Sequence, residues 1–194
     1  GEGEIFFLQE RVGKGGRVFK LFKFATMLKD SPNIGTGEVT MKGDPRVLPV
    51  GKFLRKTKIN ELPQLLNIFF GDMSVVGPRP LTAKTFDSYS AETKEVVKKV
   101  RPGLSGVGSI IFRDEEEIMH GSLASVDFYK NIIAPYKGSL EEWYISNKGI
   151  YIYFLAIFIT VWAVVFPSTK IAWSVFKDLP EPPVELRQVL NYIK

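Results

Sequence analysis

One block of the sequence, residues 55–80, carries the side chains whose types and spacing could do chemistry. Glu61 follows Asn60 at the start of an amphipathic pattern, and the positive field of a helix N-terminus suits a phosphate or a metal-bound carboxylate. Arg79 stands between two prolines that fix the backbone on both sides, which favours a rigid guanidinium able to grip phosphate oxygens. Simpler interpretations remain open: Asn60 and Glu61 cap a helix and complement its dipole, and Arg79 is a solvated turn residue.

The composition excludes several kinds of active site. The chain has no cysteine and a single histidine, His120, which we expect at the surface, so thiolate chemistry and multi-histidine metal sites are ruled out. A bound metal would be a hard cation on oxygen ligands, Mg²⁺ or Mn²⁺. The sequence has no P-loop, dinucleotide fingerprint or Ser-His-Asp arrangement.

Charge is concentrated near the start of the chain. Residues 1–60 hold 12 Lys and Arg against 6 Asp and Glu, a net charge of +6, whereas the remainder nets to −1. This part therefore favours an anionic partner: nucleic acid, phosphate groups or lipid headgroups. Five cations are candidate phosphate ligands, although each could equally be surface charge: Lys23, Arg46, Arg55, Arg101 and Arg113. The acidic run 114–117 is typical of a solvated face or a helix start, with a metal site as the lesser alternative.

The flanking elements must position these residues. Apolar residues 5–8 and 18–24 on either side of the glycines at 13–16 predict a β-hairpin, and residues 30–45 predict a loop. A helix is predicted to begin with Asn60 as its N-cap, place Pro63 in its first turn and end at Gly71. A polar helix is predicted over about 82–100.

The segment Ile150–Phe166 has seventeen residues without a charge. As a helix it would reach roughly 25 Å, short of the ~30 Å hydrocarbon core of a bilayer. Tyr and Trp residues with flanking Lys148 and Lys170 are typical of a membrane interface. The pattern thus indicates either a buried core helix or one that lies at or dips into a membrane surface. Beyond it, the prolines at 180–183 predict a tail that leaves the domain.

Five ordered motif blocks resemble the bacterial sugar transferase family, the small monotopic phosphoglycosyl transferases. The similarity runs over about residues 3–165. The blocks are Gln9-Glu10-Arg11-Val12-Gly13, Phe22-Lys23-Phe24-Ala25-Thr26-Met27, Glu61-Leu62-Pro63-Gln64-Leu65, Gly71-Asp72-Met73-Ser74-Val75-Val76-Gly77-Pro78-Arg79-Pro80 and Arg101-Pro102-Gly103-Leu104-Ser105-Gly106.

The resemblance implies a reaction. Family members use an Asp-Glu dyad whose Asp attacks the β-phosphate of a UDP-sugar, releasing UMP and leaving a covalent phosphosugar that polyprenyl (undecaprenyl) phosphate then accepts with Mg²⁺ assistance. The dyad aligns with Asn60 and Glu61, which makes these the implied catalytic positions and Glu61 the implied metal ligand. The Pro-Arg-Pro motif aligns with Pro78, Arg79 and Pro80 as a phosphate clamp, joined by Lys23.

Two residues depart from the family pattern. Asn60 stands where the nucleophilic Asp is expected, and an amide is not a competent nucleophile. Either the substitution was engineered to stop turnover, or Glu61 acts as the nucleophile, or the chain has another chemistry or none. Ala25 replaces an Arg of the family. The family's N-terminal re-entrant membrane helix would precede Gly1, and we expect truncation to account for its absence.

The resemblance implies an α+β fold, mainly helical with a small β-hairpin, in a monotopic membrane-associated domain. We expect residues 1–147 to form the catalytic core, 148–176 a membrane-interface segment and 177–194 a C-terminal extension. Implied partners are a UDP-sugar, polyprenyl phosphate, membrane lipids and a second copy in a homodimer, without nucleic acid, at the cytoplasmic face of the bacterial inner membrane. The alternatives are an inactive homologue that binds nucleotide-sugar or lipid phosphate, and a basic membrane-peripheral binding module.

Overall fold

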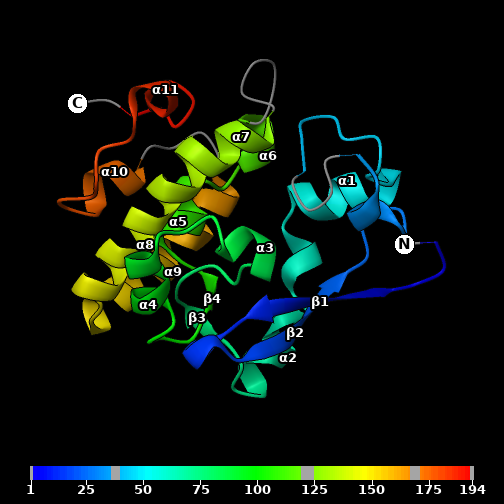
Figure 1. Ribbon diagram of the computed structural model, residues 1–194, viewed down its shortest axis with the longest axis horizontal. Coiled ribbons are helices and arrows are strands. Elements are labelled where there is room, and N and C mark those ends of the chain that lie inside the picture. The colour runs from blue at the N-terminus through cyan, green and yellow to red at the C-terminus, as the bar shows by residue number, and fades with distance from the viewer. Residues whose placement is uncertain (1, 36–39, 119–124, 167–170, 193–194) are drawn as a thin grey trace.

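The computed structural model describes residues 2–35, 40–118, 125–166 and 171–192, and its architecture is the expected one, α+β and mainly helical. Figure 1 shows the N-terminal hairpin with α1 and α2 on one side of the molecule and most of the helices on the other. The two termini lie at opposite ends of this view. His120, predicted to lie at the surface, is outside the described residues.

The predicted hairpin is confirmed. Strands β1 (Phe6–Val12) and β2 (Val18–Phe24) pair antiparallel along their whole length. The short 3₁₀ turn η1 (Lys14–Gly16) joins them, and its two glycines have positive φ, a conformation that other residues rarely adopt. Side chains alternate along β2, so Phe19 and Leu21 point to the same face and form a small separate core with Met73.

The loop after the hairpin is held by a buried ion pair. Beyond the 3₁₀ turn η2 (Ser31–Asn33), the guanidinium of Arg46 pairs with the Asp44 carboxylate. The same guanidinium donates to the carbonyl oxygens of Ser31 at 2.8 Å and Ile34 at 2.7 Å. The prediction that Arg46 binds phosphate is therefore wrong: its side chain is only 4% exposed and its donors tie the loop to itself.

The predicted helix at Asn60 starts later than expected. Helix α1 (Pro49–Lys56) is followed by the 3₁₀ turn η3 (Ile59–Glu61) and then by α2 (Gln64–Phe69). Asn60 lies inside η3 and caps no helix, while Pro63 precedes α2 as its N-cap instead of lying in its first turn. A proline blocks continuous hydrogen bonding because it has no N–H, which separates the turn from the helix. Gly71 ends the segment as predicted, with a φ of 81°.

Asn67 attaches α2 to the hairpin. Its side chain is fully buried, and its Oδ1 accepts the N–H of Phe22 at 3.0 Å. Its Nδ2 donates to the carbonyl oxygen of Lys20 at 2.8 Å. One amide thus satisfies both a donor and an acceptor on the free edge of β2. This contact fixes the turn η3 relative to Lys23 on the same strand.

The structure contains a second small sheet that the sequence did not predict. Strands β3 (Ser74–Val76) and β4 (Gly103–Ser105) pair in parallel, with Ser74 opposite Gly103. A Cβ on Gly103 would lie 2.1 Å from the backbone nitrogen of Gly77, so only glycine allows this approach. Three-residue strands are too short for periodicity to reveal.

The single polar helix predicted over 82–100 is wrong. The chain instead forms α3 (Ala83–Phe86) and α4 (Ala91–Val97), each capped by a hydroxyl, of Thr82 and Ser90 respectively. Side-chain caps satisfy the free N–H groups at helix starts and so favour two short helices. Tyr89 in the break between them is buried in the core.

The remaining helices enclose the main core. They are α5 (Val107–Ile111), α6 (Glu115–Ile118), α7 (Val126–Phe128), the π-helix η5 (Tyr129–Ile133), α8 (Ala134–Asn147), α9 (Ile150–Val165), α10 (Ile171–Val175) and α11 (Val184–Arg187). The acidic run is thus a helix start, as expected.

The apolar segment forms α9 as a helix with two different faces. Ala156 and Ile159 are buried in the core, whereas Tyr151 and Phe154 are 74% and 62% exposed. The packed face agrees with the core-helix alternative, whereas contact of the open face with a membrane surface stays a prediction. Within the described residues, no helix combines the length and apolar character needed to cross a membrane.

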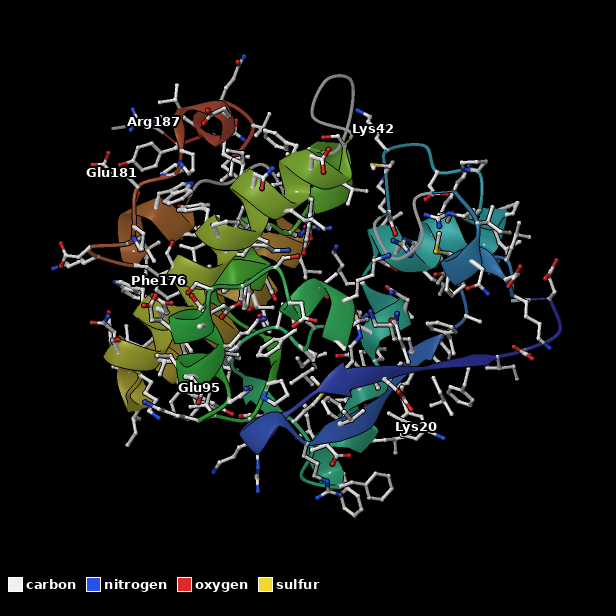
Figure 2. All side chains as sticks on the ribbon, in the orientation of Figure 1. Lys20, Lys42, Glu95, Phe176, Glu181 and Arg187 are labelled. Carbon is white, nitrogen blue, oxygen red and sulfur yellow. The ribbon has the colours of Figure 1, made fainter. Side chains whose placement is uncertain are left out.

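The C-terminal residues pack on the domain. Leu186 and Leu190 are buried in the main core, so the prediction that the tail leaves the domain does not hold for these residues. Phe176 lies among the helices (Figure 2), and its ring meets that of Trp143 edge-on at 5.9 Å.

Replacing Arg46 by Met should strongly destabilise the fold. The substitution leaves the Asp44 carboxylate buried without its partner, and we expect the free energy of unfolding to fall by about 3 kcal/mol or more. Urea unfolding followed by circular dichroism measures this. Lys29→Met, which removes an exposed ion pair with Glu4, is the matched control and should leave the unfolding midpoint unchanged. Equal behaviour of the two variants would contradict the structural role of Arg46.

Candidate functional site

Three separate segments bring charged side chains together around Glu61. The turn η3 supplies Glu61, strand β2 supplies Lys23, and the loop after β3 supplies Arg79. The Arg79 guanidinium donates to the Glu61 carboxylate, with Nη2 3.0 Å from Oε1. The two side chains remain 32% and 17% exposed, so a ligand can reach both. The sequence singled out Glu61 and Arg79 separately, and the structure brings them into direct contact.

The electrostatics favour an ionised Glu61. Burial works against its charge, but Arg79, Lys23 and Lys58 outweigh this effect and lower the pKa of the Glu61 carboxyl to about 2. The Glu61 charge in turn raises the pKa of Arg79, which stays a cation. An anionic carboxylate therefore sits among cations at neutral pH.

Lys23 has the opposite response to the same surroundings. Desolvation lowers the pKa of its ammonium to about 7, and although Glu61 attracts the charge, nearby arginines add to the lowering. Two of these arginines are Arg11 and Arg55. A cation held in a cluster of cations is costly unless an anion binds there. The site is therefore suited to a strongly anionic ligand such as a diphosphate.

Asn60 leaves one polar atom unsatisfied. Its side chain is only 7% exposed, and within the described residues its Oδ1 has no hydrogen-bond partner. A buried amide oxygen without a donor is uncommon and costs stability. Asn60 directly precedes Glu61 in the sequence. Its amide oxygen can accept a hydrogen bond or serve as a metal ligand, but it cannot act as a nucleophile.

The backbone around Arg79 is fixed from two sides. The carbonyl oxygen of Pro80 accepts a hydrogen bond from Arg11 Nη1 at 3.0 Å. The carbonyl oxygen of Pro78 accepts the N–H of Gly103 at 2.8 Å. A clamped backbone between two prolines reduces the entropy lost when the guanidinium binds a ligand. These contacts fit the expected rigid presentation of Arg79.

The other predicted phosphate ligands are divided. Arg55 on α1 is near enough to act on the pKa of Lys23, and its guanidinium contacts the hydroxyls of Thr26 at 3.4 Å and Thr40 at 3.1 Å. Arg113 bonds Asp114. Arg101 extends beside Gly71, at the end of α2 opposite to Glu61. Of these three arginines, Arg55 is the one that affects the pKa of Lys23.

Sequence reasoning missed Lys58. It precedes η3 in a left-handed conformation with a φ of 60°, and it acts on the pKa of Glu61. Its Nζ donates to the carbonyl oxygen of Arg113 at 2.8 Å, which links the turn to the helical part. A positive φ on a non-glycine residue often marks a functional position, but the sequence carries no signal for it.

The site has few donors for a metal ion. No cluster of three or more acidic or histidine side chains occurs among the described residues. Mg²⁺ commonly binds through one or two carboxylates together with substrate phosphates and water. Glu61, together with the Oδ1 of the preceding residue Asn60, which has no hydrogen-bond partner within the described residues, fits such a phosphate-borne Mg²⁺.

The pH dependence of the free energy of unfolding should reveal the lowered pKa of Lys23. Its pKa is about 7 in the folded protein against an ordinary 10.5, so between these values the unfolded chain binds more protons. The contribution of Lys23 to the free energy of unfolding therefore rises with pH. Between pH 7 and pH 9 the free energy of unfolding of the wild type, measured by urea unfolding, should rise by about 2 kcal/mol relative to that of Lys23→Met. Lys20→Met, at an exposed position of the same strand, is the control, and a constant difference for Lys23→Met would refute the assignment.

Comparison with known proteins agrees with these features. The chain is 36% identical, over 82% of its length and 35% of the other protein, to a UDP-N-acetylgalactosamine-undecaprenyl-phosphate N-acetylgalactosaminephosphotransferase of Aeromonas hydrophila. It is 37% identical to a UDP-glucose:undecaprenyl-phosphate glucose-1-phosphate transferase of Caulobacter vibrioides, over 73% of this chain and 51% of that one. It is 51% identical to a putative undecaprenyl-phosphate N-acetylgalactosaminyl 1-phosphate transferase of Bacillus subtilis, over 40% of this chain and 43% of that one.

The chain spans between about a third and a half of the length of these relatives. The model of one family, described as bacterial sugar transferase, matches residues 1–167, which include the hairpin, the turn η3 and the Pro-Arg-Pro loop. With most of its length matched, the chain belongs to the bacterial sugar transferase family.

Proposed function

We propose that the protein transfers a sugar-1-phosphate from a UDP-sugar to polyprenyl phosphate. The observation that carries the proposal is the ionised Glu61 in contact with Arg79 and close to Lys23. A cationic cluster suits the diphosphate of the donor and the phosphate of the acceptor. The named relatives from Aeromonas hydrophila and Caulobacter vibrioides act on undecaprenyl phosphate, which supports the same class of acceptor.

Glu61 is the proposed nucleophile. Its carboxylate oxygen attacks the β-phosphorus of the donor, the bond from that phosphorus to the bridging oxygen breaks, and UMP leaves with the electron pair. An oxygen of polyprenyl phosphate then attacks the phosphorus of the acyl phosphate and releases the Glu61 carboxylate. The low pKa keeps this carboxylate ionised, and the amide of Asn60 cannot take the role.

The cations act on the phosphates. Arg79 is exposed enough to exchange its contact with Glu61 for the phosphate oxygens, which frees the carboxylate for attack. Lys23, with a pKa of about 7, regains its charge when an anion binds beside it. Mg²⁺ bound by the donor phosphates and Glu61 would supply charge neutralisation.

Membrane binding through α2 is also part of the proposal. The apolar pattern of α2 faces solvent, since Leu65 is 52%, Phe69 83% and the adjoining Phe70 64% exposed. Exposed aromatic and aliphatic side chains in one patch are typical of an interfacial surface. A lipid-linked phosphate would enter from this side, close to the turn η3 at the start of α2. The nucleotide-sugar would arrive from the cytoplasm.

Release of UMP tests the transfer reaction. The full chain, with Mg²⁺, a panel of UDP-sugars and polyprenyl phosphate, should release UMP, and Glu61→Gln should lower the rate at least about a thousandfold because the nucleophile is lost. Glu95→Gln, at an exposed position on α4 (Figure 2), is the matched control and should keep wild-type activity.

The variant Asn60→Asp separates the alternatives. Activity in wild type and in Asn60→Asp agrees with a nucleophilic Glu61. Activity in Asn60→Asp alone would identify this chain as an enzyme disabled by Asn60, whether the substitution is engineered or that of an inactive homologue. Silence of both proteins would refute the transferase proposal.

Flotation with vesicles tests the membrane surface. Phe69→Glu should weaken binding to phosphatidylglycerol-containing vesicles at least about tenfold, because an apolar side chain is replaced by a charge that stays in water. Val184→Glu, also at a highly exposed apolar position but on α11, is the control. Unchanged flotation of Phe69→Glu would exclude α2 as the contact.

A further inference from the structure

The Pro78-Arg79-Pro80 segment has a single backbone donor. Proline has no N–H, so the amide of Arg79 is the only one in the tripeptide. The carbonyl oxygens of Pro78 and Pro80 are bonded to Gly103 and Arg11, as described above. The group that accepts the Arg79 N–H therefore makes the last backbone hydrogen bond that holds this loop.

A buried carboxylate accepts this N–H. Glu141 on α8 is 1% exposed, and its Oε1 lies 3.3 Å from the backbone nitrogen of Arg79. One turn later on the same helix, the hydroxyl of Tyr144 donates to the carbonyl oxygen of Val76 at 3.3 Å. Helix α8 thus holds the chain between β3 and the Pro-Arg-Pro loop at two points.

Gly108 makes room for the Glu141 carboxyl. A Cβ on Gly108 would lie 2.5 Å from Glu141 Oε1, closer than real contacts allow. A Cβ on Gly106 would lie 2.2 Å from the carbonyl oxygen of Gly77, at the entrance to the same loop. The position of α8 against the loop therefore depends on the absence of a side chain at Gly108, while the absence of one at Gly106 allows the close approach to Gly77.

Placing a carboxyl here is costly. Burial raises the pKa of Glu141 to about 7, despite the opposing effect of the Arg79 N–H and of Lys137. The charge of Lys137 is already shared with Glu115, whose carboxylate oxygens lie 2.8 Å from its Nζ. Glu141 Oε2 has no partner within the described residues. The contact to Arg79 is therefore the hydrogen bond that the structure gives this carboxyl.

We propose that Glu141 is a positioning residue, which holds the Arg79 backbone so that the guanidinium faces Glu61 and a bound phosphate. The residue acts through Arg79 and does not touch the reacting atoms. Its importance for turnover rests on the function proposed above, whereas its effect on the Arg79 backbone does not.

Amide hydrogen exchange tests the positioning directly. In Glu141→Met the chain keeps a similar shape but loses the acceptor, and the Arg79 amide should exchange about 10- to 100-fold faster by NMR. Glu141→Gln keeps an acceptor oxygen and should stay within about threefold of wild type. Glu142→Met is the matched control, because this neighbouring carboxylate on α8 bonds Thr93, away from the loop.

Kinetics then connect the position to turnover. We expect kcat/KM for the UDP-sugar to fall at least about tenfold in Glu141→Met and to be restored in Glu141→Gln, while Glu142→Met stays near wild type. If wild type releases no UMP, the transferase proposal fails, yet the exchange measurement still decides the role of Glu141. Exchange of the Arg79 amide in Glu141→Met within twofold of wild type would overturn the inference. So would a Glu141→Gln variant as impaired as Glu141→Met.

Gly108→Ala covers the case in which Glu141→Met does not fold. This substitution keeps the carboxyl and favours helix formation in α5, but its Cβ displaces Oε1 from Arg79. We expect the same faster exchange at Arg79, and wild-type exchange in this variant would overturn the inference.

Discussion

The contact between Glu61 and Arg79 joins the two parts of the molecule at the point where its chemistry is concentrated. Glu61 belongs to the part that carries the hairpin and α2, and Arg79 to the loop that leads into the helices (Figure 1). Such a pair is stable only if both partners are held in place, since each charge gives up hydration when it is partly buried. Much of the surrounding structure serves that purpose, from Asn67 beneath the hairpin to the clamped prolines.

The site is not arranged for maximal stability. Lys23 is desolvated among arginines, and the amide oxygen of Asn60 is buried without a donor. Both features cost folding free energy and both would be relieved by an anionic ligand with its metal ion. The same cost recurs behind the site at Glu141, where a buried carboxyl contacts the backbone of Arg79. Burial of apolar side chains in the main core stabilises the fold and offsets these local unfavourable contributions.

Asn60 stands where the resemblance implies an aspartate nucleophile. The turn η3 places the amide in the buried position and Glu61 in the more accessible one. A partly accessible carboxylate that is ionised by neighbouring cations has the properties of a nucleophile, and a buried amide has those of a supporting acceptor. The proposed chemistry therefore moves by one residue along the chain, from position 60 to Glu61.

By itself, the sequence determined the family and the hairpin and singled out Glu61 and Arg79 as candidate site residues, because these depend on local motifs and turn residues. Only the tertiary structure decided which cations meet. Arg46 and Lys23 are both basic residues of the N-terminal part, yet Arg46 closes a buried loop and Lys23 acts with Glu61. The parallel strands β3 and β4, the left-handed Lys58 and the role of Glu141 depend on contacts between residues far apart in sequence. Local patterns specify elements, but pairing and burial are set by long-range packing, which leaves no periodic trace in one sequence.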